Sequence, residues 1–522
     1  MKTLLHNAKI WLGKNYFASS AGIDDETGKI IFAGSGKDTD NHYDTMLDLK
    51  GRFVMPAFSD GHVHLFKGAL VSSEVDLRYA GTESEFRLRI QSYRSGLKGG
   101  NWIVGGYFSE TNFKENFSVS RDLLDSICSD VPVVIFRTDL HSVICNSLAL
   151  QMIGIESKKG EFHADELITD KENVLTGELK ERAMYYALKF IPEKSLAEKQ
   201  SVLADEISRL HRQGITSVTD ISWREDLDVY KSLYEANKLE LRINSVIPFG
   251  EFGKIKSYKE EFSPYRDFIR FGGLKAFYDG SLSSKAALFF DNYKGTGYNG
   301  LRTEMVLNGE FRETGELIDK AGYQIVVHAI GDLAVSEVLD FAEHLAEKNG
   351  SKNRRFRMEH AQHIADKDVE RFARLGIIAS VQPAHIFFDA KVADESLAHP
   401  ETTHVFKKLA GKGVRLCFGT DFPVVPVNPF DNIYYAMTRK ANGFPEGFRT
   451  EYALGLVTCL EAYTANNAYA SYTEKTAGSV AVGKNADLIV LDRDLFVSTP
   501  EEIKNTVVET TFLNGKIVFG RV

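Results

Sequence analysis

The sequence contains little cysteine: four residues in a chain of 522, at Cys128, Cys145, Cys417 and Cys459. These positions are far apart and form no C-x-x-C pair, so the sequence suggests neither a disulfide framework nor a thiolate zinc knuckle. We therefore expect the protein to fold in a reducing compartment, the cytoplasm.

Long apolar runs and basic blocks are also missing. No segment approaches the roughly 18 apolar residues of a membrane span, and His6 and Asn7 interrupt the N-terminal residues before the apolar core of a signal peptide forms. The net charge is −9 and no Lys/Arg block is present, which disfavours a nucleic-acid partner. We expect a soluble protein that binds a small molecule, without nucleic-acid or membrane partners. A homodimer stays open.

Both ends of the chain predict short strands separated by turns. Residues 8–12 and 29–33 are apolar segments next to glycines, and near the C-terminus two strands flank Leu513-Asn514-Gly515, a hairpin-like sequence. We predict one small discontinuous β-sandwich domain built from residues 1–55 and 470–522.

The middle of the chain, residues 56–469, alternates apolar strands with amphipathic helices. Ser195 to Glu198 has the form of a capping box, the helix after it has one apolar face, and Gly214 ends that helix before the strand 215–220. Such alternation predicts βαβ units and a mostly parallel sheet.

Nine strands are predicted in this region, one too many for a (β/α)₈ TIM-type barrel. They are residues 53–58, 131–137, 215–220, 241–247, 272–277, 323–327, 355–358, 377–381 and 414–419. About 150 residues separate His64 from Ile215, whereas one βα unit needs roughly 30. We therefore assign 131–137 to a large insertion after strand 1, spanning about 67–193, and the other eight strands to the barrel.

Chemically reactive side chains stand at the ends of the barrel strands. His62 and His64 follow the apolar run 53–58, and residues i and i+2 of a strand point to one face, so both imidazoles can reach one ion. Active sites of barrels lie at the C-terminal ends of the strands. The residues predicted there are His62, His64, Lys275, His328, His360 and Asp421.

Each of these residues also has an ordinary structural interpretation. A single histidine is more often satisfied by backbone groups than by a metal, and Asp421 before Phe422-Pro423 fits a turn. Lys275 is harder to explain, because a lysine inside a barrel strand must be paired, deprotonated or modified. Taken together, the six residues favour a metal site.

Five motifs now resemble a known family. Asp60-Gly61-His62-Val63-His64, the segment 274–281, His328-Ala329-Ile330-Gly331-Asp332, Glu359-His360-Ala361-Gln362 and Gly419-Thr420-Asp421-Phe422-Pro423 are similar to the metal-dependent amidohydrolase superfamily. More narrowly, they resemble its YtcJ-like branch, which includes N-substituted formamide deformylase. The resemblance covers essentially the whole chain.

The resemblance implies a role for each residue. His62 and His64 would bind one divalent ion, His328 and His360 a second, a carboxylated Lys275 would bridge them, and Asp421 would be both ligand and proton shuttle. Imidazole and carboxylate donors suit zinc, although Mn, Ni or Fe could replace it. Two such ions would activate a bridging water as hydroxide and polarise the scissile carbonyl.

The leading functional hypothesis is hydrolysis of a non-peptide C–N bond, in an amide, N-formyl or N-acyl amine. One alternative is a deaminase of a cyclic amidine with a single metal, for which Lys275 would be unnecessary. The other is a catalytically silent metal-binding or regulatory protein. Trp102, Tyr107 and His141 of the insertion are candidate substrate-binding residues, although its aromatic residues equally fit the insertion's own core.

Overall fold

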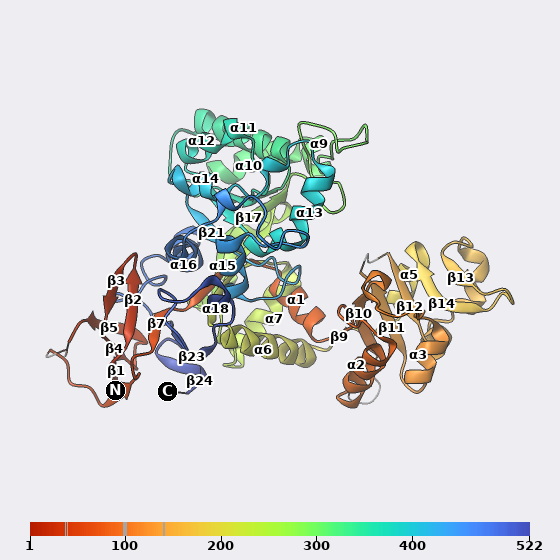
Figure 1. The fold of residues 1–522 in the computed structure, drawn as a ribbon, viewed down its shortest axis with the longest axis horizontal. Helices are drawn as coiled ribbons and strands as arrows, with labels where there is room; N and C mark the ends of the chain where they lie inside the picture. Colours follow the sequence, from red (N-terminus) through yellow and green to blue (C-terminus); the bar gives the residue numbers. More distant parts are fainter. Residues whose placement is uncertain (37, 39, 98–101, 139–140, 522) are drawn as a thin grey trace. The chain divides into compact units, whose positions relative to one another are not determined.

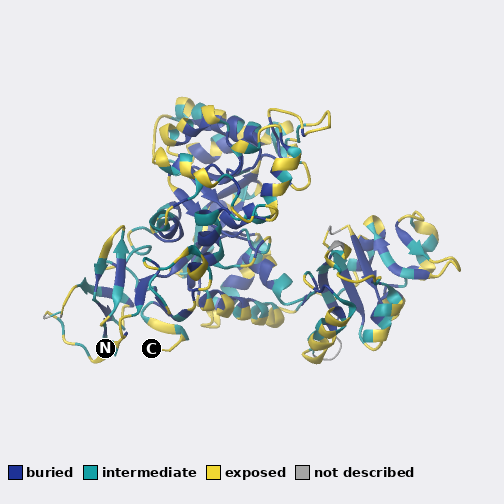
Figure 2. Cartoon of the chain, viewed as in Figure 1, coloured by how far each residue is buried: buried dark blue, intermediate teal, exposed yellow. Residues whose placement is uncertain are grey.

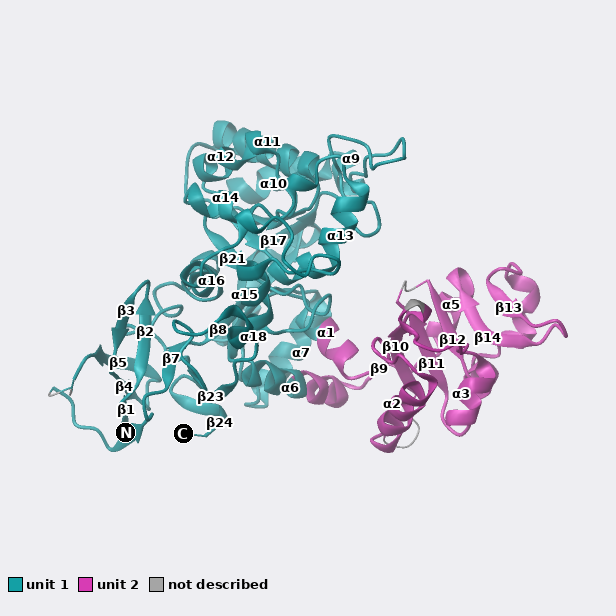
Figure 3. Cartoon of the chain, viewed as in Figure 1, with its two compact units in different colours: residues 1–66, 204–522 teal, residues 67–203 magenta. Residues whose placement is uncertain are grey.

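The computed structural model describes residues 1–36, 38, 40–97, 102–138 and 141–521. The chain forms two compact units, residues 1–66 with 204–522 and residues 67–203 (Figure 3). The predicted domain boundaries near residues 55, 193 and 470 stay predictions.

The first unit contains a sheet of eight parallel strands in the order of the chain. The strands are β8 (Phe58–Val63), β15 (Ile215–Ile221), β16 (Arg242–Pro248), β17 (Ile269–Phe277), β18 (Ile325–Ala329), β19 (Arg357–His360), β20 (Ile378–Val381) and β21 (Leu416–Phe418). A parallel bridge between Val63 and Phe422 joins the first strand to the segment after the last. The TIM-type barrel predicted from the sequence is confirmed.

Helices follow the strands, as βαβ units require. The main ones are α6 (Leu196–Arg212), α7 (Arg224–Glu235), α8 (Ile255–Glu261), α10 (Glu310–Lys320), α11 (Asp332–Asn349), α12 (Asp366–Leu375), α13 (Ile386–Ser396), α14 (Phe406–Gly411), α15 (Pro429–Thr438), α16 (Leu456–Tyr463) and α17 (Ala465–Ala470). Helices α10 and α11, which are labelled in Figure 1, pack against β18. Ser195 and Glu198 make the predicted reciprocal cap of α6, with the Glu198 amide donating to Ser195 Oγ at 3.3 Å.

The predicted first barrel strand, residues 53–58, is wrong in its placement. Residues 53–56 form β7 (Phe53–Pro56), which pairs with β2 (Lys9–Gly13) and β22 (Leu488–Leu491) in another sheet. The barrel strand is β8, which starts at Phe58 and contains His62. A single apolar run therefore supplies strands to two sheets.

Strands from both ends of the chain share this second sheet, whose order is β24-β23-β22-β7-β2-β3. Its remaining strands are β3 (Tyr16–Ala18), β23 (Val508–Leu513) and β24 (Lys516–Gly520). The Asn514-Gly515 turn between β23 and β24 has φ values of 51° and 75°, both in the left-handed region, as a tight hairpin requires.

A four-stranded sheet faces the same apolar core. It consists of β5 (Lys29–Gly34), β4 (Ser20–Asp24), β1 (Lys2–His6) and β6 (Thr45–Asp48), in that order. Leu5, Ile23, Ile10 and Leu488 from the two sheets belong to one buried cluster. The β-sandwich predicted from both termini is confirmed.

The unit 67–203 has its own mixed sheet, in the order β13-β14-β12-β11-β10-β9. Its strands are β9 (Val75–Asp76), β10 (Ile103–Phe108), β11 (Val133–Arg137), β12 (Ser142–Cys145), β13 (Leu167–Thr169) and β14 (Leu175–Lys180). Its helices are α2 (Glu83–Ser95), α3 (Arg121–Ile127), α4 (Ser147–Ile153) and α5 (Glu181–Leu188). The predicted strand 131–137 thus lies outside the barrel, as the spacing indicated.

Buried residues follow the strands, and exposed residues lie on the outer faces of the helices (Figure 2). All four cysteines are buried and free. In the part of the chain that the structure describes, no helix combines the length and the apolar character needed to cross a membrane.

Candidate metal centre

The six predicted site residues lie at the C-terminal ends of the barrel strands. His62 lies near the end of β8, and His64 follows that strand. Lys275 lies near the end of β17 and His328 near the end of β18, and His360 is the last residue of β19. Asp421 follows β21. The register of the parallel strands therefore brings residues from distant parts of the sequence to one rim.

Asp421 is the centre of this cluster. Its Oδ1 lies 3.4 Å from His62 Nε2 and 3.3 Å from His64 Nε2. Nitrogen and oxygen atoms of His62, His360 and Asp421 all lie within 4.8 Å of one another. The rings of His328 and His360 are 4.4 Å apart, so the fourth histidine belongs to the same group.

These separations suit a metal ion. Donors about 2.0–2.1 Å from a tetrahedral zinc lie about 3.4 Å from each other, close to the distances between Asp421 and the two histidines. The donor set, imidazole nitrogen with carboxylate oxygen, is one that zinc and similar divalent ions prefer.

Three buried polar atoms of the cluster are left without a partner. Lys275 Nζ, His328 Nε2 and His64 Nδ1 make no hydrogen bond to any residue that the structure describes. His328 Nε2 is 3.5 Å from Asp279 Oδ1, but the geometry is not that of a hydrogen bond. Buried polar atoms without partners are costly, so the residues fit a site that holds a bound group.

Burial sets the protonation of the cluster. It lowers the pKa of Lys275 to about 8, although Glu359 and Asp421 oppose this change. Burial and the Lys275 charge lower the pKa of His328 to about 3. Burial alone would raise the pKa of Asp421, but His62, His64 and His360 outweigh it and hold that pKa well below its ordinary value. Neutral imidazoles beside an ionised carboxylate are in the states that bind a cation.

A buried ion pair orients His62. Its Nδ1 lies 2.5 Å from Glu359 Oε2, and Glu359 accepts a second hydrogen bond from Arg357 Nε at 2.9 Å. Arg357 also donates to the Gly61 carbonyl at 2.7 Å and to Ser380 Oγ at 2.9 Å. With its Nδ1 proton donated to Glu359, His62 presents the lone pair of Nε2 to the cluster.

His360 is oriented in the same way, with Nδ1 2.8 Å from Gln382 Oε1. Both His360 and Asp421 have positive φ values, 69° and 58°. Non-glycine residues in this region are uncommon and often occur at functional sites.

Asp60 joins the two ends of the barrel sheet beneath the cluster. It accepts hydrogen bonds from the His62 amide at 3.1 Å, the Thr420 amide at 3.0 Å and Thr420 Oγ1 at 2.8 Å. The Asp421 amide in turn donates to the His62 carbonyl at 2.7 Å. The backbone positions of His62 and Asp421 are thereby fixed to each other.

Two further aspartates hold the loops around the rim. Asp279 accepts from the amides of Ile330 at 3.0 Å and Gly331 at 2.9 Å, next to His328. Asp220 accepts from the Leu65 amide at 2.6 Å, next to His64. Sequence reasoning did not assign a role to these residues, although Asp60, Asp279 and Glu359 all stand within the motifs that carried the resemblance.

The three predicted substrate-binding residues belong to the unit 67–203. Trp102 is 7% exposed and packs in that unit's core. Tyr107 donates to Glu74 Oε2 at 2.5 Å and stacks on Phe136. His141 is exposed, with Nδ1 3.0 Å from Glu181. A contact of these residues with substrate stays a prediction.

The barrel and the cluster at its rim define a class of protein, a hydrolase that uses a divalent metal. The model of the Amidohydrolase family matches residues 45–519, and the chain belongs to this family. It is therefore a hydrolase of the amidohydrolase type.

Several known proteins are similar over most of their length. The chain is 30% identical to Protein LONG AFTER FAR-RED 3 of Arabidopsis thaliana, with 91% of this chain and 83% of the relative covered. It is 28% identical to the amidohydrolase YtcJ of Bacillus subtilis (91% and 90% covered) and 24% identical to N-substituted formamide deformylase of Arthrobacter pascens (91% and 90% covered).

A solved structure supports the same assignment. The crystal structure of a metal-dependent hydrolase from Pyrococcus horikoshii superposes with a TM-score of 0.74 at 25% identity, covering 96% of this chain and 99% of that one. The predicted family and its dependence on a divalent metal are confirmed.

Proposed function

We propose that the enzyme hydrolyses the C–N bond of a non-peptide amide, an N-formyl or N-acyl amine, and releases an organic amine. The observation that carries the proposal is the buried Lys275, which has no hydrogen-bond partner among the described residues and lies at the rim shared by four histidines and Asp421. A relative that covers 91% of the chain is an N-substituted formamide deformylase.

The residues that would hold two divalent ions, zinc being our first choice, are His62, His64, His328, His360, Asp421 and a carboxylated Lys275. Such ions supply a Lewis acid for the carbonyl and lower the pKa of a water. Six ligands from one rim are more than one tetrahedral ion needs.

The environment of Lys275 supports the proposed carboxylation. A neutral amine adds to CO₂, forming an N–C bond, releasing one proton and leaving a carbamate anion. Burial lowers the pKa of Lys275 to about 8, so a larger share of the amine is neutral near pH 7 than in a surface lysine. The carbamate would also replace a buried cation by an anion with two oxygen donors.

Asp421 is the proposed proton carrier. In the reaction, the oxygen of water bonds to the carbonyl carbon, the C–N bond breaks, and the nitrogen gains a proton. The Asp421 carboxylate, ionised beside His62 and His64, accepts the proton from water and returns it to the leaving nitrogen.

The test is a panel of N-formyl and N-acyl amines, assayed with protein loaded with defined metals. We expect release of an organic amine, loss of turnover on chelation and its recovery with a divalent ion. Release of ammonia from cyclic amidines instead would favour the deaminase, and no turnover on any substrate would favour a silent, regulatory protein.

Two measurements test the proposed metal site without knowledge of the substrate. Metal analysis should find two ions per chain, and ¹³C NMR after incubation with labelled bicarbonate should show a carbamate that is absent from Lys275→Ala. Lys320→Ala, at an exposed position of α10, is the matched control and should keep both signals. The cytoplasmic location and the homodimer stay predictions.

A further inference from the structure

A polar cavity lies at the opposite ends of the barrel strands from the metal centre. It has a volume of about 260 Å³, slightly below the range of roughly 300–1,000 Å³ for drug-sized ligands, which suits a small metabolite. Its walls include the first residues of four barrel strands, the segment after α17 and part of the terminal β-sheet; Ser59, Ser217, Asn244, Arg270, Thr473 and Asp487 represent these elements.

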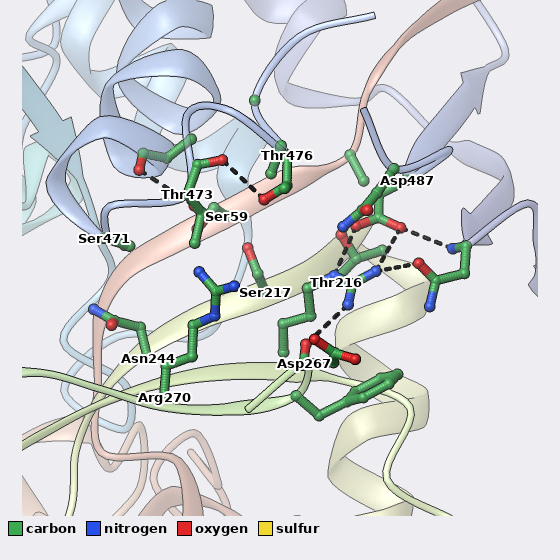
Figure 4. Close-up of a pocket in the computed structure, with 18 of the residues that line it drawn as sticks. Ser59, Thr216, Ser217, Asn244, Asp267, Arg270, Ser471, Thr473, Thr476 and Asp487 are labelled. Atoms are coloured by element: carbon green, nitrogen blue, oxygen red, sulfur yellow. Dashed lines mark hydrogen bonds and ion pairs between the residues drawn. The ribbon is translucent and has the colours of Figure 1, made fainter. Parts of the chain in front are cut away.

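Arg270 is the unusual residue of this cavity. The only hydrogen bond of its side chain to a described residue is from Nε to the Arg266 carbonyl at 3.0 Å, and no described carboxylate lies within ion-pair distance of the guanidinium. In Figure 4 its guanidinium extends toward Ser59 and Ser217, and no dashed line reaches it. The two terminal nitrogens of this guanidinium are therefore available for a bidentate contact with a ligand.

The charged side chains that line the cavity, the basic Lys29, Arg242 and Arg270 and the acidic Asp267 and Asp487, leave a small excess of positive charge, which favours an anion. Arg242 also lines the cavity, but it is paired with Asp487 at 3.0 Å, and the Asp487 carboxylate also accepts from the Asn514 amide at 2.8 Å. Lys29 donates to the neutral side-chain amide of Asn485. Burial and the charges of Arg242 and Arg266 lower the pKa of Arg270 despite Asp267, so a negative ligand would stabilise its charge.

Uncharged groups on the wall supply further recognition. The hydroxyls of Ser59 and Ser217 make no hydrogen bond to a residue within the described ranges. Asn244 is 7% exposed, and its Oδ1 has no partner among the described residues, although its Nδ2 lies 3.3 Å from Thr219 Oγ1. That oxygen is itself buried, so the two serine hydroxyls, and not Asn244, are the uncharged groups that a ligand can reach.

We propose that this cavity binds a small polar metabolite with one oxyanion, a carboxylate or a phosphate. The oxyanion pairs with Arg270 and accepts from Ser59 and Ser217. The site is separate from the metal centre, because Arg270 is at the start of β17 and Lys275 is near its end, roughly 16 Å apart at about 3.3 Å per residue.

The test is calorimetric titration of the metal-loaded enzyme with three probes: L-lactate, glycerol 3-phosphate and glycerol. We expect one anionic probe to bind and glycerol not to bind; the stronger probe identifies carboxylate or phosphate as the group recognised. Arg270→Gln should weaken that binding on the order of tenfold or more. Arg266→Gln, which removes the same charge from an exposed neighbour, should leave it within about twofold.

The proposal is overturned if neither anion binds, or if binding survives Arg270→Gln unchanged, since an anion held by the metal centre would behave in that way. Ser217→Asp provides an independent test should Arg270→Gln fold poorly, because it places a carboxylate in front of the guanidinium. Undiminished binding to a folded Ser217→Asp protein would equally contradict the site.

Discussion

Glu359→Gln is the most informative single change in the chain. Glu359 and Arg357 are both buried, and Glu359 accepts from Arg357 Nε at 2.9 Å and from His62 Nδ1 at 2.5 Å. The glutamine side chain that replaces Glu359 carries no negative charge, and only its carbonyl oxygen can accept hydrogen bonds. Breaking a buried ion pair costs about 3–5 kcal/mol, and loss of a group that orients a metal-binding histidine costs about 10–100-fold in metal affinity.

The measurement is calorimetric unfolding of metal-free protein, together with titration of zinc into it. We expect Glu359→Gln to lower the unfolding temperature of the unit that contains the barrel and to weaken zinc binding. Glu474→Gln is the matched control: Glu474 pairs with Arg355 at 2.7 Å in a partly exposed position, where an ion pair contributes about 0–1 kcal/mol. Equal stability and equal zinc affinity in the two variants would refute the role of the buried pair.

Three other predictions concern Lys275, Asp421 and the ion pair of Glu261 with Arg224. Lys275→Ala should lose metal and activity together, measured by metal analysis and turnover; a variant that keeps both would remove the lysine from the site. Asp421→Asn should reduce kcat on the order of 10²–10⁴-fold, and an unchanged kcat in metal-loaded protein would exclude Asp421 as proton carrier. Hydrogen bonds from Arg224 lower the pKa of Glu261 to about 2 from 4.5, so its stabilisation is present above pH 4.5 and is lost as the pH falls toward 2. Solvent screening limits the contribution of this ion pair to the free energy of unfolding to about 1 kcal/mol. The difference in Tm between wild type and Glu261→Gln should therefore narrow between pH 6 and pH 3; a constant difference would contradict this.

The fold was predictable where the pattern of the sequence is local. The capping box at Ser195, the hairpin at Asn514-Gly515 and the alternation of strands with helices each depend on neighbouring residues. The run 53–58 was misplaced because its residues are apolar throughout. Only its distant partners, β2 and β22 for one part and β15 for the other, decide where one strand ends and the next begins.

For the site, the sequence indicated the residues at the rim but not the contacts that hold them in place. Strand ends and motif resemblance indicated the histidines, Lys275 and Asp421, because parallel strands bring their ends to one rim. The link from Asp60 to Thr420 was not predictable, because it joins distant parts of the chain through side-chain directions that no spacing in the sequence reveals. The pairing of Arg357 with Glu359 was missed, although the two residues are i and i+2 on β19 and therefore point to one face.

The link between Asp60 and Thr420 spans 360 positions of the chain. During synthesis, a ribosome-bound fragment that has not yet reached β21 contains the histidines of the first strand but neither Thr420 nor Asp421. Such a fragment has an open sheet, and contacts between distant positions form slowly. We therefore expect the proposed metal site to be completed late in the biogenesis of the enzyme, after nearly the whole polypeptide has emerged.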